Sequence, residues 1–221
     1  MLVHCPPLTP GFNLSDGAVK AAATACGPAL KSLDLSGCGR LTDLALKHVS
    51  AKLPNLEVLG LACTNDSWDF FSDRGLRHLS RGCNRLRWLD LTRNNSVTHK
   101  GVTHLATLPF LEMLQLRGCV MVEDSVCNVL AQHDFDSLKV VDMTECHGVT
   151  NSAVLTLLAV KPELVLLSDD RETASVEARL LASAQRPDKA ECYQSRAQLM
   201  DWDPSVWRSS TERLNARSMP S

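Results

Sequence analysis

Hydrophobic positions recur along the chain in a fixed frame. In its clearest copy, Leu30, Leu33 and Leu35 are followed by Cys38 and then by Leu41. Later copies begin at Leu56, Leu86, Leu111, Leu138 and Leu164. Successive starts lie 25 to 30 residues apart, close to the period of about 20–29 residues that marks one repeat architecture of strands and helices. The chain is therefore predicted to be a stack of similar units.

Each copy predicts a short strand followed by a helix. Around Leu33 and Leu35 apolar and polar residues alternate, which indicates a strand with one buried face. From Leu41 to Val49 the apolar residues fall at helical spacing, and Thr42 is placed to cap the first turn. The same cap position is occupied in other copies by Ser15, Ser72, Thr98 and Thr150.

Stacking such units determines the fold class. No single strand–helix pair can bury its leucines alone, so neighbouring units must share one core. We predict an α/β fold, a right-handed solenoid (horseshoe) with a parallel concave sheet and convex helices. Residues 1–170 are expected to hold about five to six repeats. A C-terminal helix over 171–186 is expected to cap the core, followed by a flexible polar tail over 187–221.

Charge and composition narrow the class of partner. The chain carries 23 basic and 25 acidic residues, a formal net charge of −2 at pH 7, so it lacks the overall basic character that favours nucleic acids or anionic membranes. Met1–Pro10 has no basic region and contains Pro6 and Pro7, so we expect no secretory signal. An odd number of cysteines, 9, favours reduced thiols in the cytoplasm or nucleus.

The cysteines are candidate metal ligands, but their spacing favours structural roles. The chain has no Cys-x-x-Cys pair, whereas zinc sites need clustered ligands. One repeat position holds Cys38, Cys119 and Cys146. Asn94 fills it in another copy, as expected of a side chain that turns inward and hydrogen-bonds the loop.

The histidines are also predicted to be structural. One helix position is shared by His48, His78 and His104. Because neighbouring helices lie about 8–10 Å apart, these imidazoles are too distant to share one ion without dedicated geometry. No phosphate-binding loop, nucleophile elbow or zinc-helix motif occurs in the chain. We therefore predict no metal, no other cofactor, no catalytic residue and no enzymatic activity.

The run from Leu33 to Asp43, LDLSGCGRLTD, carries the most specific motif, and related runs begin at Leu116 and Met143. It resembles the cysteine-containing leucine-rich repeat of F-box/LRR proteins, over about residues 12–170. The resemblance implies a repeat solenoid that recognises substrates for an SCF-type ubiquitin ligase. The copy that starts at Leu56 departs from the pattern, with Thr64 at the cysteine position. Few residues precede the first half-repeat, so we expect no F-box ahead of it.

The register also predicts the concave surface, because strand side chains alternate between faces. An apolar column is formed by Val58, Trp88, Met113 and Val140, with Ser32 and Leu166 at its ends. Adjacent strands lie about 4.8 Å apart, so these side chains are expected to form one exposed stripe centred on Trp88, a hot-spot residue type. The alternative is that the C-terminal segment covers the stripe, or that Trp88 only packs on its neighbours.

Two polar columns run beside the stripe. The first holds Asp34, Asp90 and Asp142, which we expect to select a partner that carries Lys or Arg. The second holds Arg117. The predicted partner is therefore a protein with a basic patch.

The copy that starts at Leu56 has a longer connection between its strand and its helix. Trp68 and Phe70 within it are candidate partner contacts, because insertions in solenoids loop out at one rim. Equally, the loop could pack over the edge of its own repeat. Phe71 is predicted to take the buried position of Leu41.

Together these features predict a non-catalytic protein–protein interaction module in the cytoplasm or nucleus, with ubiquitin-ligase components among its candidate partners. The alternative is a structural scaffold subunit of a larger assembly. In that case the segment Trp202–Trp207 and the loop with Trp68 would provide the anchoring contacts.

Overall fold

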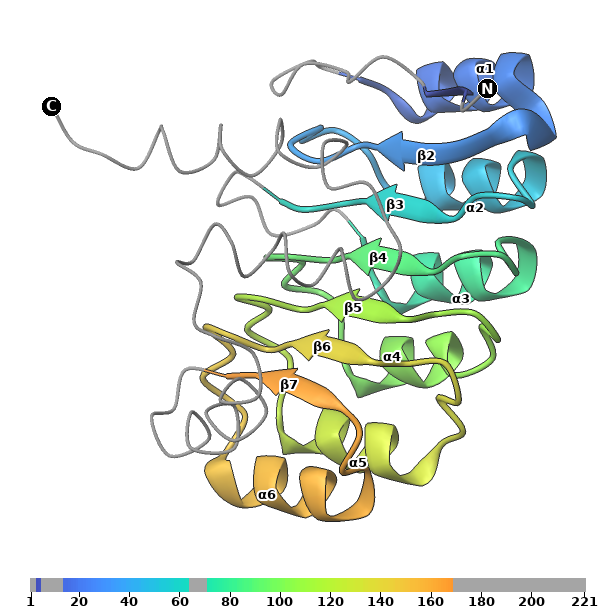
Figure 1. Ribbon diagram of the computed structural model, residues 1–221. Coiled ribbons are helices and arrows are strands. Elements are labelled where there is room, and N and C mark those ends of the chain that lie inside the picture. Colours follow the sequence, from blue (N-terminus) through green and yellow to red (C-terminus); the bar gives the residue numbers. More distant parts are fainter. Residues whose placement is uncertain (1–2, 5–13, 64–70, 169–221) are drawn as a thin grey trace, which may run out of the picture. The chain divides into compact units, whose positions relative to one another are not determined.

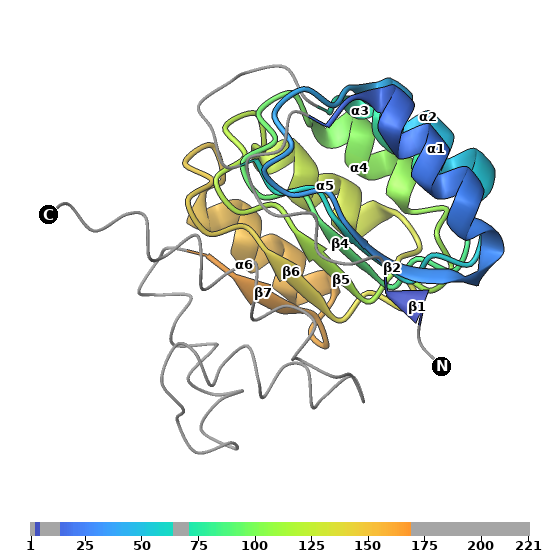
Figure 2. The same ribbon diagram turned by 90° about the horizontal axis from the view of Figure 1, so that it is seen from above.

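The computed structural model describes residues 3–4, 14–63 and 71–168, all within the compact unit Met1–Ala174. These residues form a parallel seven-stranded sheet in sequential order, with the helices on one of its faces (Figures 1 and 2). The strands are β1 (Val3–His4), β2 (Leu30–Asp34), β3 (Val58–Gly60), β4 (Trp88–Asp90), β5 (Met113–Gln115), β6 (Val140–Asp142) and β7 (Val165–Leu167). The α/β solenoid predicted from the repeats is confirmed.

Each helix lies between two consecutive strands of the chain. The helices are α1 (Asp16–Cys26), α2 (Asp43–Lys52), α3 (Asp73–Gly82), α4 (His99–Leu105), α5 (Asp124–Gln132) and α6 (Asn151–Val160), with a short 3-10 helix η1 (Gly27–Ala29) before β2. The predicted capping helix over 171–186 and the tail over 187–221 fall outside the described residues.

The core lies between the sheet and the helices. Leu59, Leu89 and Leu114 stand in register on adjacent strands, and all three are completely buried. From the helix side, Leu46 and Leu76 complete the same core and are equally buried. Burial of each such side chain contributes roughly 1.5–3 kcal/mol, so the repeated leucines are the main source of stability.

Consecutive helices are joined at their first turns by a hydrogen-bonded rung. The Asp43 carboxylate accepts from the Ser72 backbone N–H at 2.9 Å and from the Ser72 hydroxyl at 2.6 Å. Ser72 caps its own helix at the same time, because its Oγ accepts from the Arg74 N–H. Equivalent rungs join Asp16 to Thr42, Asp73 to Thr98 and Asp124 to Thr150.

The rung is absent between α4 and α5 in the part of the chain that the structure describes. Helix α4 begins with His99 where α1, α2, α3 and α5 begin with aspartate. The N-cap of α5 is Glu123, whose side chain makes no capping hydrogen bond. Both residues needed for the rung are therefore replaced at this one junction.

The change Asp73→Ala is expected to lower the free energy of unfolding by about 1–2 kcal/mol, because it leaves the N–H and hydroxyl of Thr98 without their acceptor. Urea unfolding measures the change. Asp136→Ala, at an exposed loop position, is the matched control and should change it by less than about 0.5 kcal/mol. Equal effects of the two changes would mean that the rung contributes nothing.

Two features differ from the sequence prediction. Val140 pairs with Val165 and Val141 with Leu166, so Leu166 belongs to the core and does not lie at the end of the concave column. The reason is that the sixth repeat has one residue fewer between its turn, at Leu164, and its strand. In addition, the two-residue strand β1 pairs with β2; it is too short to show an alternating pattern.

Candidate protein-binding surface

The apolar column consists of side chains in register on four adjacent strands. Val58 pairs with Trp88, Trp88 with Met113, and Met113 with Val140. None of the four belongs to the leucine core cluster, which lies on the opposite face of the sheet. Each is nevertheless buried, with 4–7% of its surface exposed. The expectation of an exposed stripe is corrected in this respect; close packing between in-register neighbours, about 4.8 Å apart, contributes to the burial.

The acidic column lies beside this apolar stripe. Each of its carboxylates accepts a hydrogen bond from the backbone N–H two residues further on, at 2.9 Å for Asp34 and Asp90 and 3.0 Å for Asp142. Burial, with a smaller contribution from the negative charges of Asp34 and Asp142, raises the pKa of Asp90 to about 6, although the hydrogen bonds from Thr92 act in the opposite direction. The three aspartates therefore hold the turns that follow their strands and also repel one another.

Gly60 provides the space that this column needs. A Cβ atom at this position would lie 2.6 Å from the Asp34 carboxylate. A larger residue would therefore displace the aspartate from its bond to the Ser36 N–H.

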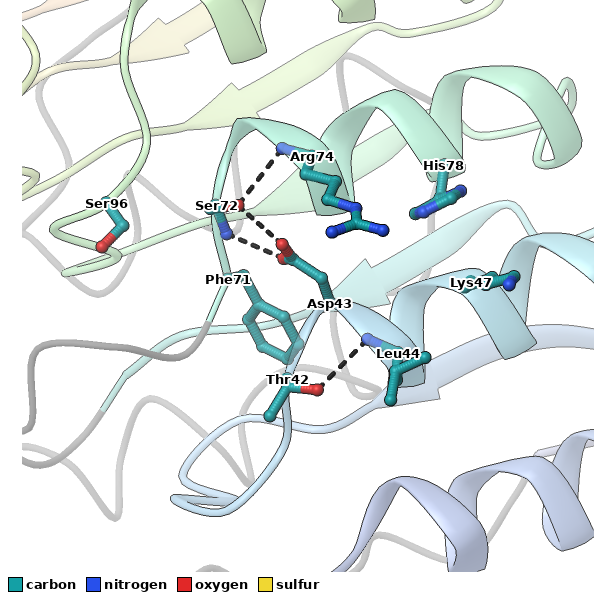
Figure 3. A pocket seen from close by; sticks show the side chains of 9 residues that line it. All are labelled: Thr42, Asp43, Leu44, Lys47, Phe71, Ser72, Arg74, His78 and Ser96. Atoms are coloured by element: carbon teal, nitrogen blue, oxygen red, sulfur yellow. Dashed lines mark hydrogen bonds between the residues drawn. The ribbon is translucent and has the colours of Figure 1, made fainter.

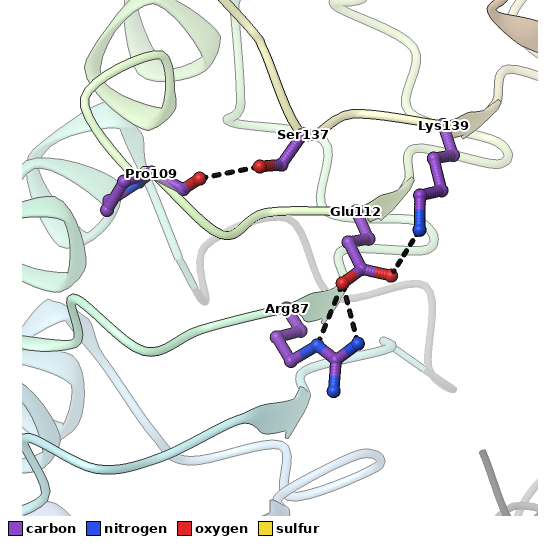
Figure 4. A network of polar contacts seen from close by, with 5 residues as sticks. All are labelled: Arg87, Pro109, Glu112, Ser137 and Lys139. Atoms are coloured by element: carbon purple, nitrogen blue, oxygen red, sulfur yellow. Dashed lines mark hydrogen bonds and ion pairs between the residues drawn. The ribbon is translucent and has the colours of Figure 1, made fainter. Parts of the chain in front are cut away.

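A third column, one residue before the stripe on each strand, alternates in charge. Lys31 pairs with Glu57 at 2.7 Å. Glu112 lies between Arg87, at 2.7 Å, and Lys139, at 3.2 Å (Figure 4). The partly exposed pair of Lys31 and Glu57 contributes only about 0–1 kcal/mol, whereas Glu112 is buried and shared by two cations. Together the pairs neutralise this side of the stripe.

Arg117, two residues after the end of β5, forms an ion pair with Glu145. The hydrogen bond from Arg117 is the main cause that lowers the pKa of Glu145, and Arg93 adds to it from 3.6 Å. Arg93 and Glu145 have positive φ angles, 59° and 61°, at the repeat position that Gly37 and Gly118 fill elsewhere. This backbone costs a non-glycine residue about 1–2 kcal/mol, which the ion pair offsets in part.

The repeated cysteine position has the structural role predicted for it. The thiols of Cys119 and Cys146 each donate, at 3.1 Å, to a backbone carbonyl of the preceding repeat, at Leu91 and Leu116. In the repeat that lacks the cysteine, the Asn94 amide donates to the Leu61 carbonyl at 2.8 Å. Burial raises the pKa values of the Cys119 thiol and, to about 12, of the Cys63 and Cys83 thiols, so these groups stay protonated.

Other candidate chemistry is limited within the described residues. No group of three or more His, Cys, Asp or Glu side chains is placed there to hold a metal ion. No described helix has the length and hydrophobicity to cross a membrane. Phe71 is buried, as predicted, whereas Trp68 and Phe70 lie outside the described residues and remain predicted contacts.

Known proteins are similar to this chain in sequence. The DNA repair protein rhp7 of Schizosaccharomyces pombe is 28% identical over 188 residues, covering 78% of this chain and 31% of rhp7. The F-box/LRR-repeat protein 4 of Bos taurus is 34% identical over 124 residues, covering 44% of this chain and 20% of that protein. The chain has the fold of a leucine-rich-repeat solenoid, and its repeats carry the cysteine position described above. No family model matches this leucine-rich-repeat protein.

Among solved structures, the leucine-rich-repeat chain is similar to one in the crystal structure of the yeast Rad7 and Elc1 complex. The TM-score is 0.49 at 24% identity, and the match covers 74% of this chain and 46% of the other. The leucine-rich-repeat chain spans less than a third of the length of the two curated relatives, at 31% and 20%.

Proposed function

We propose that the chain is a non-catalytic protein-binding module and that its concave face is the contact surface. The apolar stripe on strands β3 to β6 is the observation that carries this proposal. Its side chains lie outside the leucine core, so they are not needed to hold the helices to the sheet. Tryptophan and methionine are also enriched at protein interfaces. Because only 4–7% of each of the four side chains is exposed, a partner would contact their outer edges together with the polar columns beside them.

The charges beside the stripe favour a partner that carries Lys or Arg. On one side, burial is the main cause that raises the pKa of Asp90 to about 6, and the negative charges of Asp34 and Asp142 add to the increase; these carboxylates make the local potential along the column negative. On the other side, the alternating column largely neutralises itself. A basic segment laid along the column would relieve this repulsion and would reach Asp34 most directly, because Asp90 and Asp142 are only 4% and 5% exposed. Salt should therefore slow and weaken association with such a partner.

For the cellular role, we infer substrate recognition linked to an SCF-type ubiquitin ligase. The support is the run from Leu33 to Asp43 and the similarity to a protein named for its F-box and leucine-rich repeats. The alternative is a structural scaffold subunit that is held in a larger assembly through Trp202–Trp207, a segment outside the described residues.

Affinity capture of the full chain from cells, followed by binding measurements on the recovered partner, tests the surface. Trp88→Ala is expected to weaken binding about tenfold, whereas Trp88→Phe should retain most of the affinity because it keeps an aromatic ring in the stripe. Lys20→Glu, at an exposed position of α1 on the helix side, is the control and should leave binding unchanged. Trp88 is only 7% exposed, so its substitution also changes packing. The free energy of unfolding is therefore measured for every variant, to separate a loss of binding from a loss of folding.

The two cellular roles give different results in the same capture. Recovery of Skp-type and cullin-type components with the chain supports the ligase role. A stoichiometric assembly that survives Trp88→Ala and is lost when residues 187–221 are deleted supports the scaffold role. A folded Trp88→Ala variant with wild-type affinity contradicts the concave-face proposal.

A further inference from the structure

The outward surfaces of α2, α3 and α4 carry a basic patch that the net charge of the chain conceals. Six exposed cationic side chains form it: Lys47, Lys52, Arg74, Arg77, Arg81 and Lys100. The three arginines follow one line along α3, at axial separations of about 4.5 and 6 Å. Lys47 takes the position in α2 that Arg77 takes in α3, and Lys100 takes the position of Arg74 in α4.

The acidic residues of these helices do not pair with the basic patch. Asp43 and Asp73 are the only acidic residues in α2, α3 and α4, and both are half-buried. Each uses both carboxylate oxygens in a rung to the next helix. All the ion pairs formed among the described residues involve cations outside the patch.

The basic patch is hollowed between the first turns of α2 and α3. A cavity of about 450 Å³ opens there, and Lys47, Arg74 and His78 line it (Figure 3). The Arg74 guanidinium lies beside the His78 ring. Burial and the charges of Lys47 and Arg74 lower the pKa of His78. Asp43, which also lines the cavity, has the opposite effect, but Lys47, Arg74 and the nearby Arg81 outnumber it, so the charges around the hollow are predominantly positive.

The composition of the basic patch indicates the class of partner. Protein interfaces bury an apolar, aromatic-rich centre from which lysine is depleted. Of the large apolar side chains in α2, α3 and α4, only Leu44 is exposed, and these three helices contain no Phe, Tyr or Trp. Arginine and lysine without apolar anchors are the side chains that contact phosphate backbones. Single strands would also need aromatic rings on which bases stack, so a duplex fits better.

We propose that the basic patch binds the phosphate backbone of double-stranded nucleic acid without reading its sequence. The patch lies on the helix face, away from the concave stripe, so this inference is independent of the protein-binding proposal. If about four of the six cations each neutralise one phosphate, the logarithm of the association constant should fall with the logarithm of the salt concentration with a slope of about −3.6.

Fluorescence anisotropy of the full chain with labelled duplex DNA of about 20 base pairs, at about 50 and 200 mM salt, tests this inference. Arg77→Glu is expected to weaken binding about tenfold, because it removes one phosphate contact and adds a repulsive charge. The matched control is Arg40→Glu, an exposed arginine outside the basic patch, which should change binding less than about twofold. Lys100→Glu is a second variant in case Arg77→Glu does not fold.

Duplex RNA is expected to bind within a few-fold of duplex DNA, and single-stranded DNA of the same length more weakly. Three results would each overturn the inference. These are wild-type protein that does not bind the duplex at low salt, equal losses for Arg77→Glu and Arg40→Glu, and displacement of the duplex by poly-glutamate at equal charge concentration. The last result would mean that the patch attracts any polyanion.

Discussion

Replacing Leu114 by alanine is expected to lower the free energy of unfolding by about 2–5 kcal/mol. Leu114 is completely buried on β5, between Leu89 on β4 and Val141 on β6. The change removes a side chain that both neighbouring strands and the helices enclose. Because the sheet register fixes these neighbours, they can only partly close the resulting cavity. Urea unfolding followed by circular dichroism measures the loss.

The control for this prediction is the same substitution at a solvent-exposed leucine. Leu155 in α6 is 54% exposed, so Leu155→Ala should change the free energy of unfolding by less than about 0.5 kcal/mol. Similar losses of stability for the two variants would show that the repeated leucines do not stabilise the fold through their burial.

Gly82→Ala is expected to cost about 1–3 kcal/mol, although alanine is the better helix former. A Cβ atom on Gly82, the last residue of α3, would lie 2.1 Å from the backbone carbonyl oxygen of Ser50 in α2. A backbone atom cannot rotate away as a side chain can, so the two helices would have to separate. The same urea unfolding experiment measures the loss.

Gly17→Ala in α1 is the matched control. A Cβ atom there meets only the Ser15 hydroxyl oxygen, at 3.7 Å. The change should therefore stabilise the protein by roughly 0.5–1 kcal/mol, as alanine does in an open helix. Loss of stability at Gly17, or none at Gly82, would contradict the close approach of α3 to α2.

Local features of the sequence were sufficient to predict the architecture. The leucine frame identified β2 to β6 and their buried faces, because a two-residue period leaves one choice of face, whereas β1 was missed and the face of β7 was predicted wrongly. Thr42 and Ser72 marked helix starts, because each sits directly ahead of a helical apolar pattern. Asn94 in a cysteine position indicated a hydrogen bond, since an amide and a thiol share the ability to donate to a carbonyl.

The features that the sequence did not predict depend on loop geometry and on packing in three dimensions. The aspartates of the concave face could be placed in register, but their bonds to the backbone of their own turns, as at Asp90 and Thr92, depend on loop geometry. The burial of Trp88 depends on packing around it in three dimensions. The basic patch was concealed because a net charge averages over the whole chain, whereas a partner meets one face at a time.

The missing rung between α4 and α5 has a consequence for the way the solenoid folds. In a linear array, stability is the sum of the intrinsic stability of each unit and its coupling to the next unit. At this junction the coupling is weakened, and α4, with 7 residues, is also the shortest α-helix described. The array should therefore behave as two cooperative blocks that share the continuous sheet, one ending at α4 and one beginning at β5. Native-state hydrogen exchange would then resolve two sets of amide protection, with the boundary between Leu105 and Met113.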